Sequence, residues 1–131
     1  MYEQETAGMV VRVEPEFVPE QSEPDENRFV WSYTIEIENR SADPVQLLSR
    51  FWRITDENGL TQEVRGPGVI GQQPVIGPGQ SFRYTSAAPL AAPSGVMFGA
   101  YSMQRMDNGE AFDIAVPAFA LESPHQSRMI N

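Results

Sequence analysis

Apolar and polar residues alternate over several short stretches of this chain. In the clearest stretch, 29–38, aromatic and β-branched residues occupy every second position from Phe29 to Ile37, and mostly polar residues lie between them. This period of two predicts a half-buried strand with one core face and one wet face. A weaker form of the same pattern predicts a first strand over about 9–15, and Pro15 suits that strand to the edge of a sheet.

The middle of the chain predicts two more strands and a long loop. Residues 45–55 are apolar on both alternating sets, which predicts a strand covered on both faces. The pair Asn58-Gly59 can supply the positive φ angles of a hairpin turn, so 60–65 is expected to pair back as a strand. Residues 66–80 contain five Gly and three Pro, and they predict an irregular loop whose scattered apolar residues pack partly against the domain.

Alternation returns after this loop. It predicts strands at 81–86, 96–106 and 112–121, and two prolines in 87–94 indicate an extended connection between the first two of them. The total is seven short strands separated by turn residues, without a convincing amphipathic helix. The expected fold is therefore all-β, a seven-stranded antiparallel β-sandwich.

A length of 131 residues suits one domain. We expect a single domain over 1–131, with its structured part at about 8–121 and a polar, frayed tail over 122–131. The residues expected in the core are the inward-facing members of the strands: Trp31, Tyr33, Ile35, Ile37, Leu47, Phe82, Tyr84, Tyr101 and Ile114.

Composition excludes several classes of function. The chain has no Cys, which rules out disulfides, thiolate metal sites and a cysteine nucleophile. All nine basic residues are Arg, so a Walker lysine and a Schiff-base lysine are also excluded. A net charge of -9 argues against nucleic acid as a partner. Because neither a long apolar run nor a signal-peptide pattern is present, we expect a soluble, cytoplasmic protein without membrane insertion.

Three features resemble metal or catalytic sites only weakly. Eight of the 18 acidic residues lie in 3–26, but their spacing matches no metal loop, and a solvated surface segment is the preferred interpretation. The single histidine, His125, lies in the expected tail, where it would make a poor catalytic base. Strand alternation points Met97 and Met103 toward the core rather than toward a soft metal ion. We expect no metal site, no cofactor and no catalytic residues.

The string from Gly66 to Gly71 satisfies G-x-G-x-x-G, the dinucleotide-binding fingerprint. That fingerprint needs a helix after the turn, and Pro74 and Pro78 prevent one of useful length. Two alternatives remain open: an amide nest for a phosphate-like anion, or a structural role for glycine in tight turns. The hypothetical anion- or partner-binding loop consists of Arg65, Gly66, Gly68, Gly71, Gln73 and Arg83.

Several motifs resemble the ApaG family, in one order over about 8–121. They include Val45-Gln-Leu-Leu-Ser-Arg50, Gly66-x-Gly68-Val69-x-Gly71-x-Gln73-Pro74, Phe82-x-Tyr84-Thr85-Ser86 and Pro117-Ala-Phe119. The resemblance implies a sandwich of the fibronectin type III or immunoglobulin-like kind. It also implies an association with cobalt resistance and magnesium efflux, and a use as an interaction module in eukaryotic F-box proteins. The resemblance does not imply any securely assigned enzymatic activity.

Two classes of function follow. The first is a non-enzymatic protein-interaction module with an unknown protein partner, or a homodimer. The alternative is an ion-binding or phosphate-binding protein linked to Mg²⁺ and Co²⁺ homeostasis. If a strand edge mediates association, we expect it to be 60–65, because Glu14 and Pro15 blunt the first strand. A proline at Gln62 should then abolish the association. Gly68→Ala together with Arg65→Ala should weaken partner or anion binding while leaving the melting temperature within a few degrees.

Overall fold

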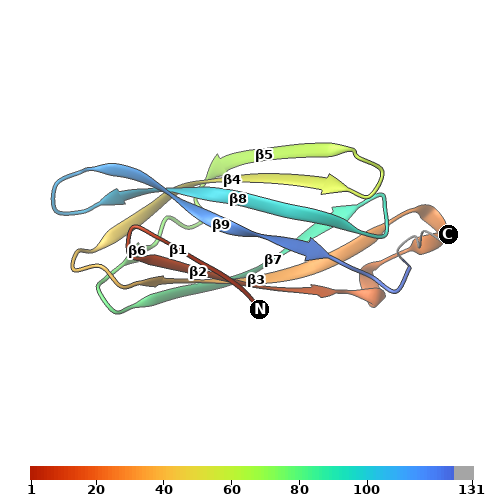
Figure 1. Cartoon of the computed structure of the whole chain (residues 1–131), viewed down its shortest axis with the longest axis horizontal. Coiled ribbons are helices and arrows are strands. Elements are labelled where there is room, and N and C mark those ends of the chain that lie inside the picture. The colour runs from red at the N-terminus through yellow and green to blue at the C-terminus, as the bar shows by residue number, and fades with distance from the viewer. Residues whose placement is uncertain (126–131) are drawn as a thin grey trace.

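The computed structural model describes residues 1–125, and two antiparallel sheets make up most of them (Figure 1). One sheet has the strand order β1-β2-β3-β7, and the other has the order β5-β4-β8-β9, with β6 paired to β4. The strands are β1 (Tyr2–Thr6), β2 (Met9–Phe17), β3 (Phe29–Asn39), β4 (Val45–Asp56), β5 (Thr61–Pro67), β6 (Val75–Ile76), β7 (Ser81–Leu90), β8 (Gly95–Arg105) and β9 (Ala111–Leu121). Two short 3-10 turns, η1 (Pro19–Gln21) and η2 (Pro24–Glu26), carry part of the acidic segment. The all-β sandwich is confirmed, with nine strands in place of seven.

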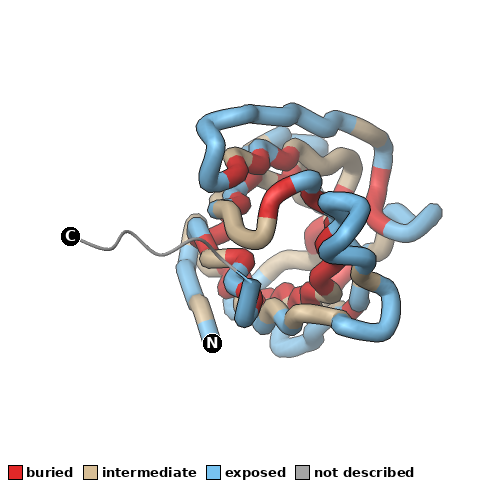
Figure 2. Tube along the Cα trace, turned by 90° about the vertical axis from the view of Figure 1, so that its right-hand side faces the viewer, coloured by how far each residue is buried: buried red, intermediate tan, exposed pale blue. Residues whose placement is uncertain are grey.

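The core lies between the two sheets, where the buried segments gather while exposed segments surround them (Figure 2). Along β3, buried and half-buried residues alternate almost without exception, as the period of two predicts. Eight of the nine residues expected in the core are buried, and Phe82 is half-buried against it. Met97 and Met103 also face inward and are buried. In the described part of the chain, no helix is long and apolar enough to cross a membrane.

The prediction that the first strand forms a sheet edge is wrong, because β1 pairs antiparallel with β2 and covers it. Ala7 and Gly8 join the two strands with φ angles of 52° and 81°. Positive φ at both central residues is the geometry of a two-residue hairpin turn. The residues of β1 are mostly polar, and for that reason periodicity gave no sign of this strand.

The expectation that β4 is covered on both faces is also wrong. A β-bulge at Leu48 shifts the pairing of β4 with β8. Val45 and Leu47 face the core before the bulge, and Trp52 and Ile54 face it afterwards. One extra residue reverses the alternation, so a strand with a single buried face carries apolar residues on both sets.

Residues 66–80 are more regular than expected. Val69 and Gln72 form a β-bridge, with Ile70 and Gly71 at φ angles of 42° and 77° between them. This tight hairpin leads to β6, which adds to the same edge of β4 as β5. The prediction that part of the loop packs against the domain is confirmed, since Val69 is buried.

The C-terminal tail begins as an attached segment. Trp31 Nε1 donates a hydrogen bond of 2.8 Å to the carbonyl oxygen of Glu122. The His125 ring lies 6.0 Å from the rings of Phe17 and Phe29. Fraying therefore does not begin at Glu122, and residues 126–131 of the expected tail lie outside the described residues.

The two lateral sides of the sandwich differ. On one side β1 lies against β9: Ala115 N donates to Thr6 Oγ1 (3.3 Å) and Ala120 N donates to Tyr2 Oη (3.2 Å). On the other side the edge strands are β5 and β7. β7 runs to Leu90 and so includes half of the predicted extended connection.

Candidate functional site

The three glycines of the G-x-G-x-x-G string each have a structural role. At Gly66, a Cβ would lie 2.9 Å from Nη1 of Arg50, its partner on β4. Gly68 has a φ of +59°, and a Cβ there would lie 2.2 Å from the carbonyl oxygen of Gln72. Gly71 completes the hairpin turn. Because β6 and β7 follow this string rather than a helix, the geometry of a dinucleotide site is absent from the described residues.

Hydrogen-bond donors of this loop are largely used within the chain. Gly68 N donates to Leu48 O (2.8 Å), while Val69 N and Gln72 N donate to each other's carbonyl oxygens (2.8 and 2.9 Å). The Gln73 side chain also donates to Leu48 O, at 2.9 Å. The amide of Gly68 is therefore unavailable to the amide nest that the sequence left open, and the loop offers an anion few free amides.

The structure does not bring together the two arginines of the predicted site. Arg65 lies over the Phe51 ring at 4.2 Å, on the outer face of the five-stranded sheet. Arg83 pairs in register with Glu36 and lies on the outer face of the other sheet. Strand alternation directs these side chains to opposite surfaces of the sandwich, and no joint positive patch forms.

The arginine that lies under the loop is Arg50. The bulge in β4 places it on the inward face, in phase with Trp52 and Ile54. Its Nη1 donates to the carbonyl oxygens of Pro67 and Gly68, both at 3.0 Å. Within residues 1–125, no carboxylate forms an ion pair with Arg50. Arg50 is thus a half-buried cation whose charge lacks an acidic partner in the described chain.

Arg50 lines a groove of about 220 Å³ on the open lateral side of the sandwich. The groove lies between β5 and β7, and buried apolar side chains of β4 and β8 form its floor. None of the described residues that line it is acidic, although the chain has 18 acidic residues. The lining residues are Tyr33, Arg50, Trp52, Ile54, Gln62, Val64, Ser86, Ala87, Ala88, Pro89 and Met97.

Buried tyrosines lie behind this groove. Burial raises the pKa of Tyr33, Tyr84 and Tyr101, and the positive charge of Arg50 opposes the rise in all three. The hydroxyls of Tyr84 and Tyr101 share a hydrogen bond of 2.5 Å. Arg50 therefore lies near neutral hydroxyl groups in a poorly solvated region, where a charge interacts more strongly than at an open surface.

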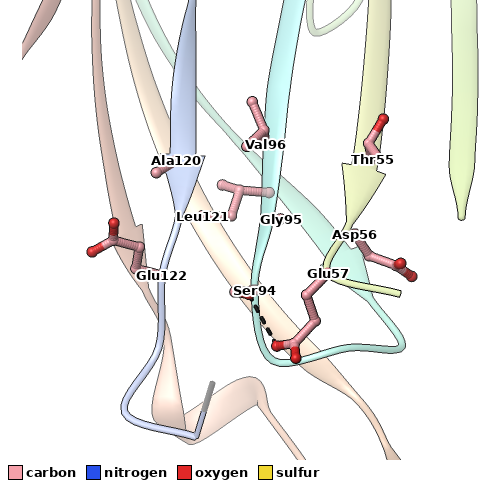
Figure 3. Close-up of a pocket in the computed structure, with 9 residues that line it drawn as sticks. All are labelled: Thr55, Asp56, Glu57, Ser94, Gly95, Val96, Ala120, Leu121 and Glu122. Atoms are coloured by element: carbon pink, nitrogen blue, oxygen red, sulfur yellow. Dashed lines mark hydrogen bonds between the residues drawn. The ribbon is translucent and has the colours of Figure 1, made fainter. Parts of the chain in front are cut away.

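A larger hollow, of about 390 Å³, lies at one end of the sandwich (Figure 3). Its carboxylates do not converge: the side chains of Asp56 and Glu122 point away from each other, and Glu57 accepts a 2.9 Å hydrogen bond from Ser94 Oγ. The Asp56 carboxylate also accepts hydrogen bonds from two backbone amides of the β4–β5 turn. Within residues 1–125, no three Asp, Glu or His side chains are placed to hold a metal ion. The groove at Arg50 is the better candidate.

The sequence interpretation missed Arg50, and a signal for it was present. Apolar residues occupy odd positions at Val45 and Leu47 but even positions at Trp52 and Ile54. A strand with one buried face can show this change of phase only if it contains a bulge. Arg50 shares the even phase of Trp52 and Ile54, so this change of phase would have placed it on the inward face.

Fold and groove together define an antiparallel β-sandwich domain with one open lateral side. The ApaG domain family matches residues 19–105. Protein ApaG of Methylobacterium sp. (strain 4-46) is 54% identical over 131 residues, 100% of both chains. The crystal structure of the putative ApaA protein from Bordetella pertussis superposes with a TM-score of 0.85 at 44% identity, covering 90% of this chain and 95% of that one. A second solved structure, structural genomics target SoR45, gives a TM-score of 0.85 at 34% identity, covering 98% and 96%. The chain belongs to the ApaG family.

Proposed function

We propose that this ApaG-family protein is a non-enzymatic interaction module of the cytoplasm that binds an extended segment of a protein partner along β5. The observation that carries the proposal is the free edge of β5, which lies beside a groove lined without acidic residues. An unpaired strand edge offers main-chain hydrogen bonds to an added strand, and adjacent pockets for its side chains supply specificity.

Backbone hydrogen bonds at both ends of β5 show which of its residues bond to β4 and which face the free edge. Leu60 O accepts from Asp56 N, and Gly68 N donates to Leu48 O. Opposed residues in an antiparallel ladder alternate between hydrogen-bonded and non-bonded pairs, so the even-numbered residues of β5 bond to β4. The odd-numbered residues direct their N–H and C=O groups toward the free edge: Thr61, Glu63 and Arg65.

The other edge on this side, β7, is less suited to pairing. Asn39 N donates to Gln80 O, so the even-numbered residues of β7 form the hydrogen bonds to β3. The odd-numbered residues, Pro89 among them, face the free edge. Proline has no N–H to donate, and natural sheets use it to blunt edges. A proline at Gln62 does not test the edge, because the backbone of Gln62 bonds to β4 and a proline there would break the sheet itself. At Glu63, an outward position near the middle of β5, a proline removes an N–H that faces the free edge and leaves the hydrogen bonds to β4 in place.

Site-specific crosslinking in cells tests the proposal. A photo-reactive phenylalanine analogue replaces Glu63, and a matched control carries it at Thr85, an outward-facing position on β7. We expect a partner to crosslink at position 63 and not at 85. Calorimetry with that purified partner should then show at least tenfold weaker binding to Glu63→Pro than to Thr85→Pro. Equal affinity in two folded variants would refute β5 as the binding edge. If the crosslinked partner is a second copy, sedimentation velocity should show a dimer that Glu63→Pro dissociates.

One observation favours a second candidate, anion binding linked to Mg²⁺ and Co²⁺ homeostasis. Arg50 supplies an uncompensated charge of the kind that phosphates bind. Calorimetric titration with pyrophosphate, ATP, Mg²⁺ and Co²⁺ tests this candidate. Binding of pyrophosphate that Arg50→Gln abolishes would support it, whereas flat titrations would leave the interaction module as the function.

A further inference from the structure

We propose that the groove between β5 and β7 captures the C-terminal carboxylate of an extended peptide, and that Arg50 binds this carboxylate. The inference rests on the proposed function and specifies which part of the partner the module recognises. Three features of the groove support it: the unpaired charge, the size and polarity of the space, and the closed end at Arg50.

The positive charge of Arg50, which has no acidic partner in the described residues, favours binding of an anion. One nitrogen, Nη1, makes both of its hydrogen bonds within the chain, to Pro67 O and Gly68 O. Nη2 and Nε keep their donors for a ligand, and two such donors match the two oxygens of a carboxylate. Those two bonds also hold the guanidinium in place, so less side-chain entropy is lost when a ligand binds.

The size of the groove suits a peptide side chain better than a small-molecule ligand. Its volume of about 220 Å³ is below the range of roughly 300 to 1,000 Å³ that is usual for ligand pockets. Trp52, Ile54 and Met97 give it an apolar floor, and Val64 of β5 lines one wall. One or two apolar side chains from a strand added to β5 would fill this space and bury apolar surface on both partners.

The closed end of the groove favours a chain terminus over an acidic side chain. Arg50 binds the carbonyl oxygen of Gly68, and the next residue, Val69, is 1% exposed and belongs to the core between the sheets. The hairpin that carries Val69 continues along the edge of β4, where β6 occupies the next pairing positions. A chain that enters along β5 therefore ends at Arg50. Its C-terminus then lies at the C-terminal end of β5, so the bound peptide runs parallel to that strand.

Binding of a model tripeptide tests the inference directly. The probes are acetyl-Val-Val-Leu with a free carboxylate and the same tripeptide with a C-terminal amide, each titrated into the full-length protein and followed by NMR. We expect the acid to shift the backbone amides of Val64 and Ser86 and the Nε–H of Arg50, and to bind at least tenfold more tightly than the amide. Equal affinities for acid and amide, or shifts confined to residues outside the groove, would overturn the proposal.

Variants of the groove separate the charge from the fold. Arg50→Gln should bind acid and amide equally, whereas Arg50→Lys should retain part of the preference for the acid. Arg53→Gln is the matched control, because Arg53 lies on the outer face of the same strand and pairs with Glu63 at 3.9 Å. If Arg50→Gln does not fold, Val64→Glu serves instead: it places a competing carboxylate in the groove from an exposed position and should abolish binding of the acid.

This experiment can fail without the proposed function failing. If neither tripeptide binds while the crosslinked partner still depends on the edge at Glu63, carboxylate capture is wrong and the interaction module stands. If the tripeptide acid binds through Arg50 but no partner crosslinks at position 63, the carboxylate site is real and its ligand is not a strand paired to β5.

Discussion

The two lateral sides of the sandwich solve the problem of unpaired strand edges in different ways. Where β1 meets β9, the hydroxyls of Thr6 and Tyr2 accept hydrogen bonds from backbone amides of β9, and the centroid of the Tyr2 ring lies 6.1 Å from that of the Phe119 ring. Where β5 faces β7, a groove remains between the edges. One side of this fold therefore closes its edges with side-chain hydrogen bonds and ring contacts, whereas the other leaves two strand edges unpaired within the described residues.

The open side still carries protection against aggregation. Charged residues Glu63 and Arg65 lie on β5, and Pro89 lies on β7. Apolar groups are nevertheless exposed there, with Leu60 at 62% and Val64 at 39% exposure. The edge of β5 is therefore only partly blunted, because exposed apolar side chains lie beside the charged ones.

The largest expected effect comes from opening the closed side. A chain that starts at Met9 lacks β1 and should lose more than about 3 kcal/mol of unfolding free energy, because it exposes the edges of β2 and β9 together. Thermal unfolding should show a midpoint lower by roughly 10 °C, and sedimentation should show self-association. Tyr2→Phe is the control, with a loss of about 1 kcal/mol for one hydrogen bond. An unchanged midpoint in the truncated chain would mean that β1 does not stabilise this side.

The hairpin that closes the groove should be nearly as sensitive. Gly68→Ala should cost about 3 kcal/mol, because the new Cβ meets the carbonyl oxygen of Gln72 at 2.2 Å and the residue has positive φ. Gly71→Ala has the same backbone problem but no atom within 4 Å of the new Cβ, and it should cost about 1 kcal/mol. Chemical denaturation measures both. Equal losses would show that the close contact does not matter. The close contact at Gly68 therefore speaks against the expectation that Gly68→Ala together with Arg65→Ala keeps the melting temperature within a few degrees.

A smaller loss is expected from the tyrosine pair behind the groove. Tyr101→Phe leaves the buried hydroxyl of Tyr84 without its partner and should cost about 2 kcal/mol. The double variant with Tyr84→Phe should lose less than the sum of the two single variants, because no orphaned hydroxyl remains. Additive losses in a double-mutant cycle would show that the two hydroxyls are not coupled.

The smallest effect is a dependence on alkaline pH. Burial raises the pKa of Tyr84 and Tyr101, so the folded protein keeps these protons near pH 10 while the unfolded chain releases them. The stability contributed by the two tyrosines is thus complete well below pH 10, and it falls as the pH approaches and passes 10. Between pH 8 and 10 the wild type should lose about 1 kcal/mol more than the double Phe variant. Parallel pH profiles of the two proteins would contradict the assignment.

Much of the fold could be predicted because strand patterns are local. The alternation in β3 and β8 comes from side chains pointing to opposite faces of a pleated strand, which holds wherever the strand is placed. The strand β1 escaped prediction because it is stabilised by its partners and not by its own apolar residues. Its position against β2 and β9 follows from contacts that no window of the sequence contains.

The candidate site could be predicted only in part, because proximity in sequence is not proximity in a sheet. Arg65 and Arg83 both flank the loop in the sequence, yet alternation sends them to opposite faces. Arg50 is remote from the loop in sequence, yet it lies under Gly66 once β4 and β5 pair. The glycines of the string make room for the Arg50 guanidinium and for the hairpin turn.

The sequence by itself determined the all-β class, the inward residues of the main strands and the exclusion of lysine and cysteine chemistry, because composition and local periodicity are sufficient for those. Only the tertiary structure decided which edges are covered and which residues meet at the groove. The bulge at Leu48 shows the physical reason: one extra residue turns Arg50 from the outer face to the inner one, and the pairing of β4 with β8 fixes where that residue is accommodated.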